Sequence, residues 1–353
     1  MIVVRAPMRI SFVGGGTDQP NFYRKHGGAV ISSAIDKFVY VVINRTPLID
    51  KVSARYSISE TVDHSSKLQH TRIKAALMDL GIEKGLEIAS FASLPAKTGI
   101  GSSSSFSVAL MKALHAYKGK KIDKREAAEA ASRLEIELLG EPIGKQDQYA
   151  AAFGGFNVFT FNPDETVTVE PVLLDYKKRL ELEDHLLVFF TGITRHASSV
   201  LTEQKSNIDK TTGTLKEMAA MVPDFKSSLV KGDFKRLGDL LHEGWLKKKG
   251  LASGISSSVI DGLYGAGMAA GAWGGKVLGA GGGGCVMFIA PLEKKAAIRS
   301  MVWDVARKNN LGDFQEIPVA FVQSGAEVLY NGDDLSQISP PKADPPMAEN
   351  FKN

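Results

Sequence analysis

The sequence has little of several features that define whole classes of protein. It has one cysteine in 353 residues, Cys285, so it has no internal disulfide, and the apolar neighbours of Cys285 predict a small core residue. No uncharged apolar run reaches the length of a membrane-spanning helix. Arg5 and Arg9 interrupt the apolar N-terminus, and no small-residue cleavage pattern follows it. We therefore expect a cytoplasmic protein.

The excess of positive charge is also small. Lys and Arg number 43 against 39 Asp and Glu, and no basic run is longer than the three residues Lys247–Lys249. This balance predicts neither a nucleic-acid partner nor a membrane partner, and it is compatible with a small anionic substrate. A chain of 353 residues with 44% hydrophobic content is long enough for two packed domains. We leave open whether it forms a homodimer.

Familiar kinase motifs are missing as well. The sequence contains no G-x-x-x-x-G-K-[ST] phosphate loop and neither the H-R-D nor the D-F-G motif of protein kinases. A phosphotransferase built from this chain must therefore have another architecture.

The stretch Leu94–Ala113, LPAKTGIGSSSSFSVALMKA, is the strongest local signal. Its segment Gly99–Phe106 holds two glycines and four consecutive serines, and an apolar pattern of helical period follows from Phe106. This pattern predicts a flexible loop that enters a helix N-terminus, where free backbone N–H groups and the helix dipole favour a phosphate. A serine-rich N-cap is the alternative, although one serine would satisfy a cap.

Two glycine-rich segments could bring backbone close to a ligand. The first, Gly14–Asp18 (GGGTD), follows a predicted strand, and Asp18 can accept hydrogen bonds from sugar hydroxyls; a plain glycine-rich turn is the alternative. The second lies within Gly274–Ala290 and formally contains G-x-G-x-x-G. A strand follows it where a dinucleotide-binding fold requires a helix, which excludes that fold. We expect this second loop to lie against the serine loop.

Two carboxylates flank a Gly-Glu-Pro turn. Glu135 lies on a predicted helix that begins after the capping pair Asp123 and Glu126, and Asp147 follows the turn. A chain reversal here would bring both carboxylates to one site, where one could hold Mg²⁺ and the other could orient or deprotonate a hydroxyl. The remaining acids of this stretch, Glu137 and Glu141, are interpreted as surface residues.

The pattern of apolar residues predicts alternating strands and helices. We expect strands over 2–13 (broken at Pro7), 29–44, 52–59, 86–93, 185–191, 316–322 and 327–330, and a hairpin over 154–161 and 166–173. We expect helices over 68–80, 197–221, 224–248, 256–270 and 292–309.

Three segments resemble the GHMP small-molecule kinases, the superfamily of galactokinase, homoserine kinase and mevalonate kinase. They are Ala6–Asp18, Pro95–Ser104 and Leu278–Cys285, and the spacing E-x4-G-x-P-x-G-x2-D from Glu135 to Asp147 resembles the sugar-kinase branch. The resemblance implies an α+β, two-domain fold with an active-site cleft between the domains. The N-terminal α+β domain would span 1–180 and the C-terminal α/β sandwich 181–331, and we expect residues 332–353 to form an extended or disordered tail.

The resemblance also implies ATP and Mg²⁺ as cofactors and assigns roles to residues. Ser103 and Glu135 would hold Mg²⁺, Asp147 would be the catalytic base, and Arg9 would lie near the transferring phosphoryl group. The residues expected to bind the nucleotide are Pro95, Gly99, Gly101, Ser102, Ser103 and Ser104. The residues expected to bind the acceptor are Gly15, Gly16, Thr17, Asp18, Arg72, Lys74, Arg195, Gly281 and Gly282.

One departure narrows the acceptor. Galactokinases carry G-E-H-T-D where this chain has GGGTD at Gly14–Asp18, so the acidic and imidazole side chains of that motif are missing here. This difference argues against galactose as the acceptor. Together with TGITR and KQDQ, GGGTD resembles instead the D-glycero-α-D-manno-heptose 7-phosphate kinases, which implies transfer to the anomeric hydroxyl of a sugar phosphate. Arg195, Arg72 and Lys74 are then the candidates for binding the acceptor phosphate. A fucose- or galactose-type hexose 1-kinase and a non-catalytic regulator that senses ATP and sugar remain the alternatives.

Overall fold

Two sheets of unequal size organise the chain, which the computed structural model describes over residues 1–194 and 197–332. The larger sheet has the strand order β12-β1-β2-β5-β3-β4, and β6 and β7 extend it from β2. Its strands are β1 (Ile2–Val13), β2 (Gly28–Arg45), β3 (Val52–Arg55), β4 (Ser59–Val62), β5 (Leu86–Ala92), β6 (Phe156–Phe161), β7 (Val167–Pro171) and β12 (Glu327–Asn331). The smaller sheet has the order β11-β8-β10-β9 and consists of β8 (Leu186–Phe190), β9 (Gly274–Val277), β10 (Cys285–Ile289) and β11 (Gln315–Glu316).

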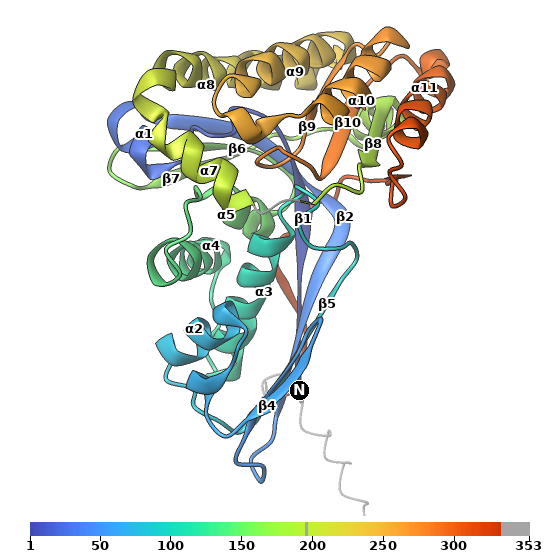
Figure 1. The fold of residues 1–353 in the computed structure, drawn as a ribbon. Helices are drawn as coiled ribbons and strands as arrows, with labels where there is room; N and C mark the ends of the chain where they lie inside the picture. Colours follow the sequence, from blue (N-terminus) through green and yellow to red (C-terminus); the bar gives the residue numbers. More distant parts are fainter. Residues whose placement is uncertain (195–196, 333–353) are drawn as a thin grey trace, which may run out of the picture.

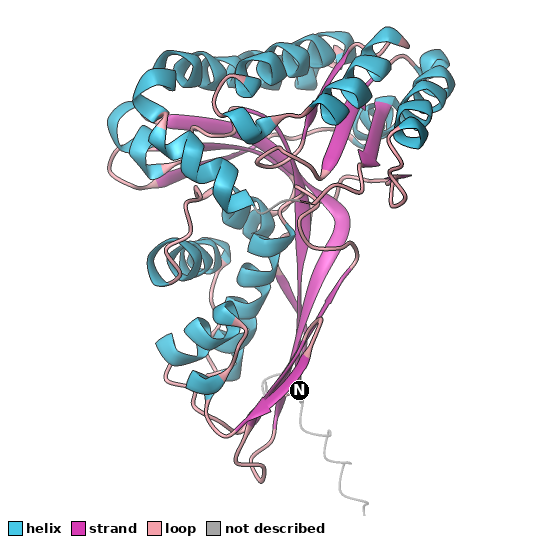
Figure 2. Ribbon diagram, in the orientation of Figure 1, coloured by secondary structure: helices cyan, strands magenta, loops and turns pink. Residues whose placement is uncertain are grey.

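Helices cover both sheets (Figures 1 and 2). One group lies along one side of the long sheet: α2 (Thr71–Asp79), α3 (Ser102–Tyr117), α4 (Lys124–Ser132) and α5 (Gln146–Phe153). A second group lies over the smaller sheet: α9 (Phe234–Lys249), α10 (Ser258–Ala269) and α11 (Lys295–Lys308). Helix α8 (Ile208–Lys231) lies beside α9 and packs against β1 and β2 of the larger sheet. The remaining α-helices are α1 (Pro20–His26), α6 (Tyr176–His185) and α7 (Ala197–Ser206). None of the helices in the described part of the chain is both long and apolar enough to cross a membrane.

Strand β1 connects the half of the molecule around the larger sheet with the half around the smaller sheet. Its two ends lie in different apolar clusters. Near its start, Val4 packs in one apolar cluster with Val108 of α3. Near its end, Phe12 packs in another cluster with Phe225 of α8 and Met287 of β10. The last strand, β12, returns to pair with β1 in the larger sheet. The second cluster therefore contains residues of both halves, and the boundary at residue 180 stays a prediction.

The predicted fold class is confirmed, and so are most of the predicted elements. The hairpin of β6 and β7 is antiparallel, the capping box of Asp123 and Glu126 begins α4, and Cys285 is buried in the core. The predicted break at Pro7 is wrong. β1 runs through this residue, with a register shift between Pro7 and Met8 against β2. A bulge accommodates proline because the missing N–H is not needed in the ladder there.

Three other predicted boundaries are also wrong. The chain between 197 and 249 forms three helices, with breaks at Asn207 and at Gly232–Asp233, while Pro223 lies inside α8. Gly232 has a left-handed backbone conformation (φ 80°), which ends α8. The glycine therefore sets the end of this helix, and the proline at 223 does not. The predicted strand 316–322 is reduced to the two residues of β11. Beyond it the backbone leaves the smaller sheet and reaches the larger one, where Ala320 and Asp36 exchange hydrogen bonds.

Candidate active site

The functional segments predicted from the sequence meet at one large cleft of about 970 Å³ between the two halves. It is bordered by the end of β1, the GGGTD turn, the serine loop, the start of α5, α7 and the glycine-rich loop between β9 and β10. The predicted site residues that line it are Arg9, Gly15, Gly16, Asp18, Arg72, Pro95, Gly99, Gly101, Ser102, Ser103, Ser104, Asp147 and Gly281.

The serine loop and the second glycine-rich loop are packed backbone against backbone. A Cβ at Gly99 would lie 2.5 Å from the carbonyl oxygen of Leu278, and one at Gly279 would lie 2.7 Å from the Cα of Gly99. Only glycine permits so close an approach, and both residues also have a positive φ. The predicted contact between the two loops is thereby confirmed. α3 begins directly after Gly101, so its free N–H groups face the same cleft.

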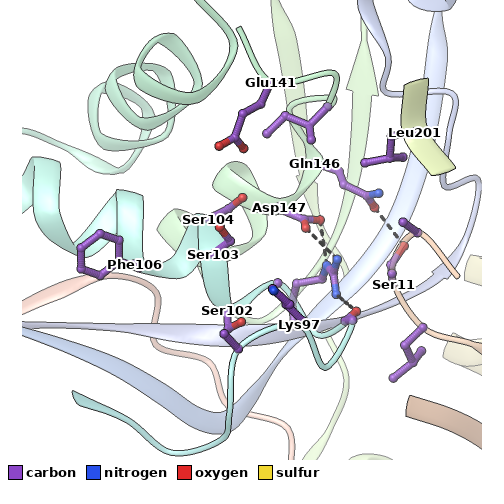
Figure 3. A pocket seen from close by; sticks show the side chains of 18 of the residues that line it. Ser11, Lys97, Ser102, Ser103, Ser104, Phe106, Glu141, Gln146, Asp147 and Leu201 are labelled. Atoms are coloured by element: carbon purple, nitrogen blue, oxygen red, sulfur yellow. Dashed lines mark hydrogen bonds and ion pairs between the residues drawn. The ribbon is translucent and has the colours of Figure 1, made fainter. Parts of the chain in front are cut away.

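Arg9 and Asp147 form the best-defined ion pair of the cleft. Nε and Nη2 of Arg9 donate to the two carboxylate oxygens of Asp147 at 2.8 and 2.7 Å, and Nη1 donates to the carbonyl oxygen of Gly99 at 2.8 Å (Figure 3). The Arg9 side chain is 3% exposed and that of Asp147 is 24% exposed. The arginine therefore fixes the carboxylate while one side of Asp147 stays accessible from the cleft.

The first residues of α5 attach three different parts of the site to one helix. Gln146 accepts a 2.9 Å hydrogen bond from the hydroxyl of Ser11 on β1. Asp147 binds Arg9, and the side-chain amide of Gln148 donates to Glu135. This is the segment KQDQ, whose consecutive side chains each contact another element. The position of Asp147 is therefore determined by the whole helix start rather than by one bond.

Glu135 is completely buried and is surrounded by donors from this chain. Its carboxylate accepts hydrogen bonds from the hydroxyls of Ser104 and Ser107, both at 2.8 Å, from Gln148, and from Nε of Arg72 at 3.3 Å. It lies on a π-helical turn, 133–138, that continues α4, and such turns often occur at functional sites. Ser104 thus connects Glu135 to the cleft, whereas Ser103 faces solvent one residue earlier.

Asp18 is a buried carboxylate between the GGGTD turn and α5. It accepts hydrogen bonds from the backbone N–H groups of Gly16 at 3.0 Å and of Gln146 at 3.3 Å. Burial, and then the neighbouring charge of Asp147, raise the pKa of Asp18. Gly144 packs so closely that a Cβ there would lie 2.1 Å from Oδ2 of Asp18. Asp18 therefore holds the start of α5 in addition to lining the cleft.

Several predicted ligand residues lie behind the surface of the cleft. The Thr17 hydroxyl is buried and donates to the carbonyl oxygens of Gly14 and Ala29, so it shapes the turn. The N–H of Gly282 donates to the carbonyl of Ile255. Ser105, interpreted as an ordinary residue of the first helical turn, donates to the carbonyl of Pro7 and ties α3 to β1.

Of the cations predicted to bind an acceptor phosphate, the structure describes Arg72 and Lys74, and only Arg72 lines the cleft. Arg72 lines the cleft but is paired with Glu135 and, at 2.7 Å, with both oxygens of Glu141. Lys74 is not among the cleft-lining residues, and Arg195 lies outside the described residues. The interpretation of Glu141 as a surface acid is wrong, because it lines the cleft and binds Arg72.

Among the cleft residues that were not identified from the sequence are Lys248, Lys276 and Gln204, whose side chains are polar and buried. Lys248 is one of three consecutive lysines, and only the fold distinguishes it from its neighbours. Lys276 donates to the carbonyls of Ser11 and Phe12 at 2.8 and 2.7 Å. Gln204 of α7 is 2% exposed, and its side-chain nitrogen has no hydrogen-bond partner among the described residues. Nothing in the local sequence marks this glutamine.

Two family models match the chain. The GHMP kinases N terminal domain matches residues 69–155, which include the serine loop, Glu135 and Asp147, and the GHMP kinases C terminal domain matches residues 225–304, which include the glycine-rich loop.

Similar proteins match more than four fifths of the chain. A D-glycero-alpha-D-manno-heptose 7-phosphate kinase of Campylobacter jejuni is 28% identical over 310 residues, which are 83% of this chain and 91% of that protein. An L-fucokinase/L-fucose-1-P guanylyltransferase of Bacteroides fragilis is 26% identical and is covered over 35% of its length. The crystal structure of a D-glycero-D-manno-heptose 1-phosphate kinase from Bacteroides thetaiotaomicron superposes with a TM-score of 0.76 at 26% identity, covering 94% of this chain and 99% of that one.

The fold and the cleft thus define a two-domain kinase of small molecules that transfers a phosphoryl group to an alcohol. The chain carries both GHMP kinase domains and is a sugar kinase of the GHMP type. GHMP kinases use ATP as the phosphate donor.

Proposed function

We propose that this protein transfers the γ-phosphoryl group of ATP to the anomeric hydroxyl of D-glycero-α-D-manno-heptose 7-phosphate and so forms the 1,7-bisphosphate. The observation that carries the proposal is the Arg9–Asp147 pair, which lines the cleft together with the N-terminus of α3 and the buried Asp18. Similarity to a heptose 7-phosphate kinase over 83% of the chain supports the acceptor.

In this proposal the nucleotide extends from an aromatic end of the cleft to the serine loop. Tyr56, His70 and Phe106 line that end, and the ring of His70 contacts both other rings. Flat aromatic surfaces suit a nucleobase. The phosphates would then bind the N–H groups at the start of α3, with Ser102 and Ser103 beside them.

The chemical step requires little more than positioning and neutralisation of charge. Asp147 orients the anomeric hydroxyl and accepts its proton as the oxygen attacks the γ-phosphorus. The bond from this phosphorus to the leaving ADP oxygen breaks, and the new bond to the anomeric oxygen forms. Arg9 keeps the Asp147 carboxylate in place and adds a positive charge beside the reacting oxygens.

The oxygen donors at the serine loop fit Mg²⁺, which binds hard oxygens and is often held by one or two protein groups and by substrate phosphates. The described residues contain no cluster of three or more acidic, histidine or cysteine side chains that could hold a metal alone. We propose that Ser103 and Glu135 hold the ion. Since four side chains already donate to Glu135, one of them must yield for direct contact, and Ser104 and Arg72 are the two that line the cleft. When bound, Mg²⁺ supplies positive charge to the nucleotide phosphates.

The acceptor is proposed to lie between the GGGTD turn and α7. Asp18 offers a carboxylate for sugar hydroxyls, and Gln204 offers an amide nitrogen without a partner among the described residues. Gly16 separates the two, and a Cβ there would lie 2.5 Å from Nε2 of Gln204. A glycine at this position therefore leaves room for the side-chain amide of Gln204 at the edge of the proposed acceptor site. Arg195 stays the first candidate for the 7-phosphate, because Arg72 is neutralised by two carboxylates.

The test is an assay of ADP formation with purified protein, Mg-ATP and a panel of acceptors. Heptose 7-phosphate, fucose, galactose and mannose are compared by kcat/KM, and ³¹P NMR of the product identifies the phosphorylated oxygen. We expect heptose 7-phosphate to be preferred and phosphorylated at its anomeric oxygen. A preference for fucose or galactose would establish the hexose 1-kinase alternative. ATP and sugar binding without ADP formation would establish the regulator.

A further inference from the structure

Lys248 is a buried lysine that faces the cleft from the last turn of α9. Its side chain is among the cleft-lining residues, it is 7% exposed, and Nζ donates a hydrogen bond to the carbonyl oxygen of Gly279 in the glycine-rich loop. Its two neighbours point away and form ion pairs near the surface, Lys247 with Glu217 and Lys249 with Asp261. Of these three lysines, only Lys248 contributes its charge to the site.

The charges that face Lys248 leave its ammonium without a direct counter-ion. Arg9, Asp18, Asp147 and Lys276 are close enough for their charges to influence it. Asp147 is engaged by Arg9, and Asp18 by backbone N–H groups. Within the described residues Lys248 forms no ion pair, and Gly279 uses one of its three N–H donors. Burial, and then the charge of Arg9, lower the pKa of Lys248 to about 8.

A buried cation with unused donors is costly unless a ligand supplies an anion. The position of Lys248 selects among the anions that the cleft would hold. Lys248 contacts Gly279, which packs against the serine loop where the nucleotide phosphates are proposed to lie. Asp18 and Asp147, which are proposed to bind the acceptor, line the same cleft and are close enough for their charges to influence Lys248. The group that crosses this junction is the γ-phosphoryl group.

We propose that Lys248 is a catalytic residue that donates hydrogen bonds to the phosphoryl group in transit between ATP and the sugar. This inference rests on the proposed kinase reaction in this cleft. Lys248 takes no proton in the step: the γ-phosphorus exchanges its bond to the ADP oxygen for one to the sugar oxygen, and the hydroxyl proton goes to Asp147. Lys248 and Arg9 approach the transferring group from different elements, α9 and β1, and together offset the charge on its oxygens.

The experiment replaces Lys248 by methionine, which keeps the length of the side chain and removes the charge. Lys249→Met is the matched control, since it removes a neighbouring charge on the surface. Loss of a donor that acts in the transition state lowers turnover about 100-fold or more. We therefore expect that loss of kcat in Lys248→Met with little change in the KM of either substrate, and no change in Lys249→Met. Lys248→Arg, which keeps the charge, should recover part of the loss.

A binding measurement supplies a second readout. Calorimetry with ADP, aluminium fluoride and the acceptor, which together imitate the group in transit, should show weakened binding to Lys248→Met, while ADP alone binds as before. If Lys248→Met unfolds, Lys248→Gln replaces it, and thermal unfolding is checked for each variant.

Three outcomes would overturn the inference. An unchanged kcat would do so. A rise only in the KM of phosphorylated acceptors would assign Lys248 to the acceptor phosphate, and a loss only of ATP affinity would assign it to the bound triphosphate. Failure of the proposed kinase reaction is distinguishable, because the unaltered protein would then turn over none of the sugars.

Discussion

The hydroxyl of Ser104 lies 2.8 Å from Oε2 of the buried Glu135, whereas Ser103, the residue before it, points to solvent. Successive side chains of a helix point about 100° apart, so two adjacent serines at the start of one helix face different environments. One serine faces the protein interior and the other faces the cleft, and this difference can be measured.

Ser104→Ala should lower the free energy of unfolding by about 1–3 kcal/mol, because a buried carboxylate loses one of its donors. Ser103→Ala should change it by less than about 0.5 kcal/mol, as is usual for an exposed side chain. Urea unfolding followed by circular dichroism measures both. Equal stability of the two variants would show that the Ser104–Glu135 contact contributes little.

Ser103→Ala should instead raise the Mg²⁺ concentration required for half-maximal turnover several-fold, because the proposed site loses an oxygen ligand. The assay titrates Mg²⁺ at fixed ATP and acceptor. The Ser104→Ala variant is the comparison. If its Mg²⁺ requirement rises while that of Ser103→Ala does not, Ser104 is the metal-facing hydroxyl and the role proposed for Ser103 is wrong.

Asp147→Asn should reduce kcat by roughly 10²–10⁴-fold, the range associated with loss of a general base. The amide still accepts one hydrogen bond from Arg9 but cannot take the hydroxyl proton. Nucleotide affinity, measured by calorimetry with a non-hydrolysable ATP analogue, should stay nearly unchanged. Glu137→Gln is the control, because Glu137 is an exposed acid paired with Arg133. Near-normal turnover of Asp147→Asn would remove Asp147 from this role.

Much of the site could be predicted because its signals are local. Glycine is required where two backbones touch, as at Gly99 and Gly279. The four consecutive serines mark the N-terminus of α3 independently of the rest of the chain. The chain reversal between Glu135 and Asp147 follows in the same way from Pro142 and the glycines around it. These features report the conformation of a few consecutive residues.

The rest depends on contacts between distant segments. Lys247, Lys248 and Lys249 are the same residue type in one helical turn, and only the packing of α9 against β9 decides which one enters the cleft. The burial of Gln204 similarly depends on where α7 lies relative to the GGGTD turn. Strand β12 joins the first sheet across more than 300 residues, which no local pattern indicates.

Gln204→Leu should raise the KM of the acceptor about tenfold and leave the KM of ATP unchanged. Its buried amide nitrogen lies beside Gly16 and has no partner in the described part of the chain, so a sugar hydroxyl is its expected partner. A lost hydrogen bond of about 1–1.5 kcal/mol corresponds to this factor. Gln315→Leu, an exposed change outside the cleft, is the control. Equal effects on both substrates would argue for a structural role of Gln204.

The pH dependence of kcat/KM should report Lys248, because this constant reflects ionisations of the free enzyme. Its pKa is lowered to about 8, and the cation is the active form in the proposed step, so kcat/KM should fall as the pH rises through about 8. Burial raises the pKa of the nearby Asp18, but carboxylates ordinarily titrate at acid pH, and an arginine side chain keeps its charge throughout this range. Lys276, whose pKa is also lowered by burial, is the one competing basic group among the described neighbours.

Lys248→Arg separates these two lysines. Arginine keeps its charge throughout this pH range, so the variant should lose the fall in kcat/KM above pH about 8, although its maximal rate is lower. Lys276 is present in both proteins, so if it were the responsible group, kcat/KM would fall with rising pH in the same way in each. Rate profiles of the unaltered protein and Lys248→Arg between about pH 6 and 10, with Lys249→Met as the control, measure the difference. If the fall in kcat/KM at high pH persists unchanged in Lys248→Arg, Lys248 is not the group that must stay charged.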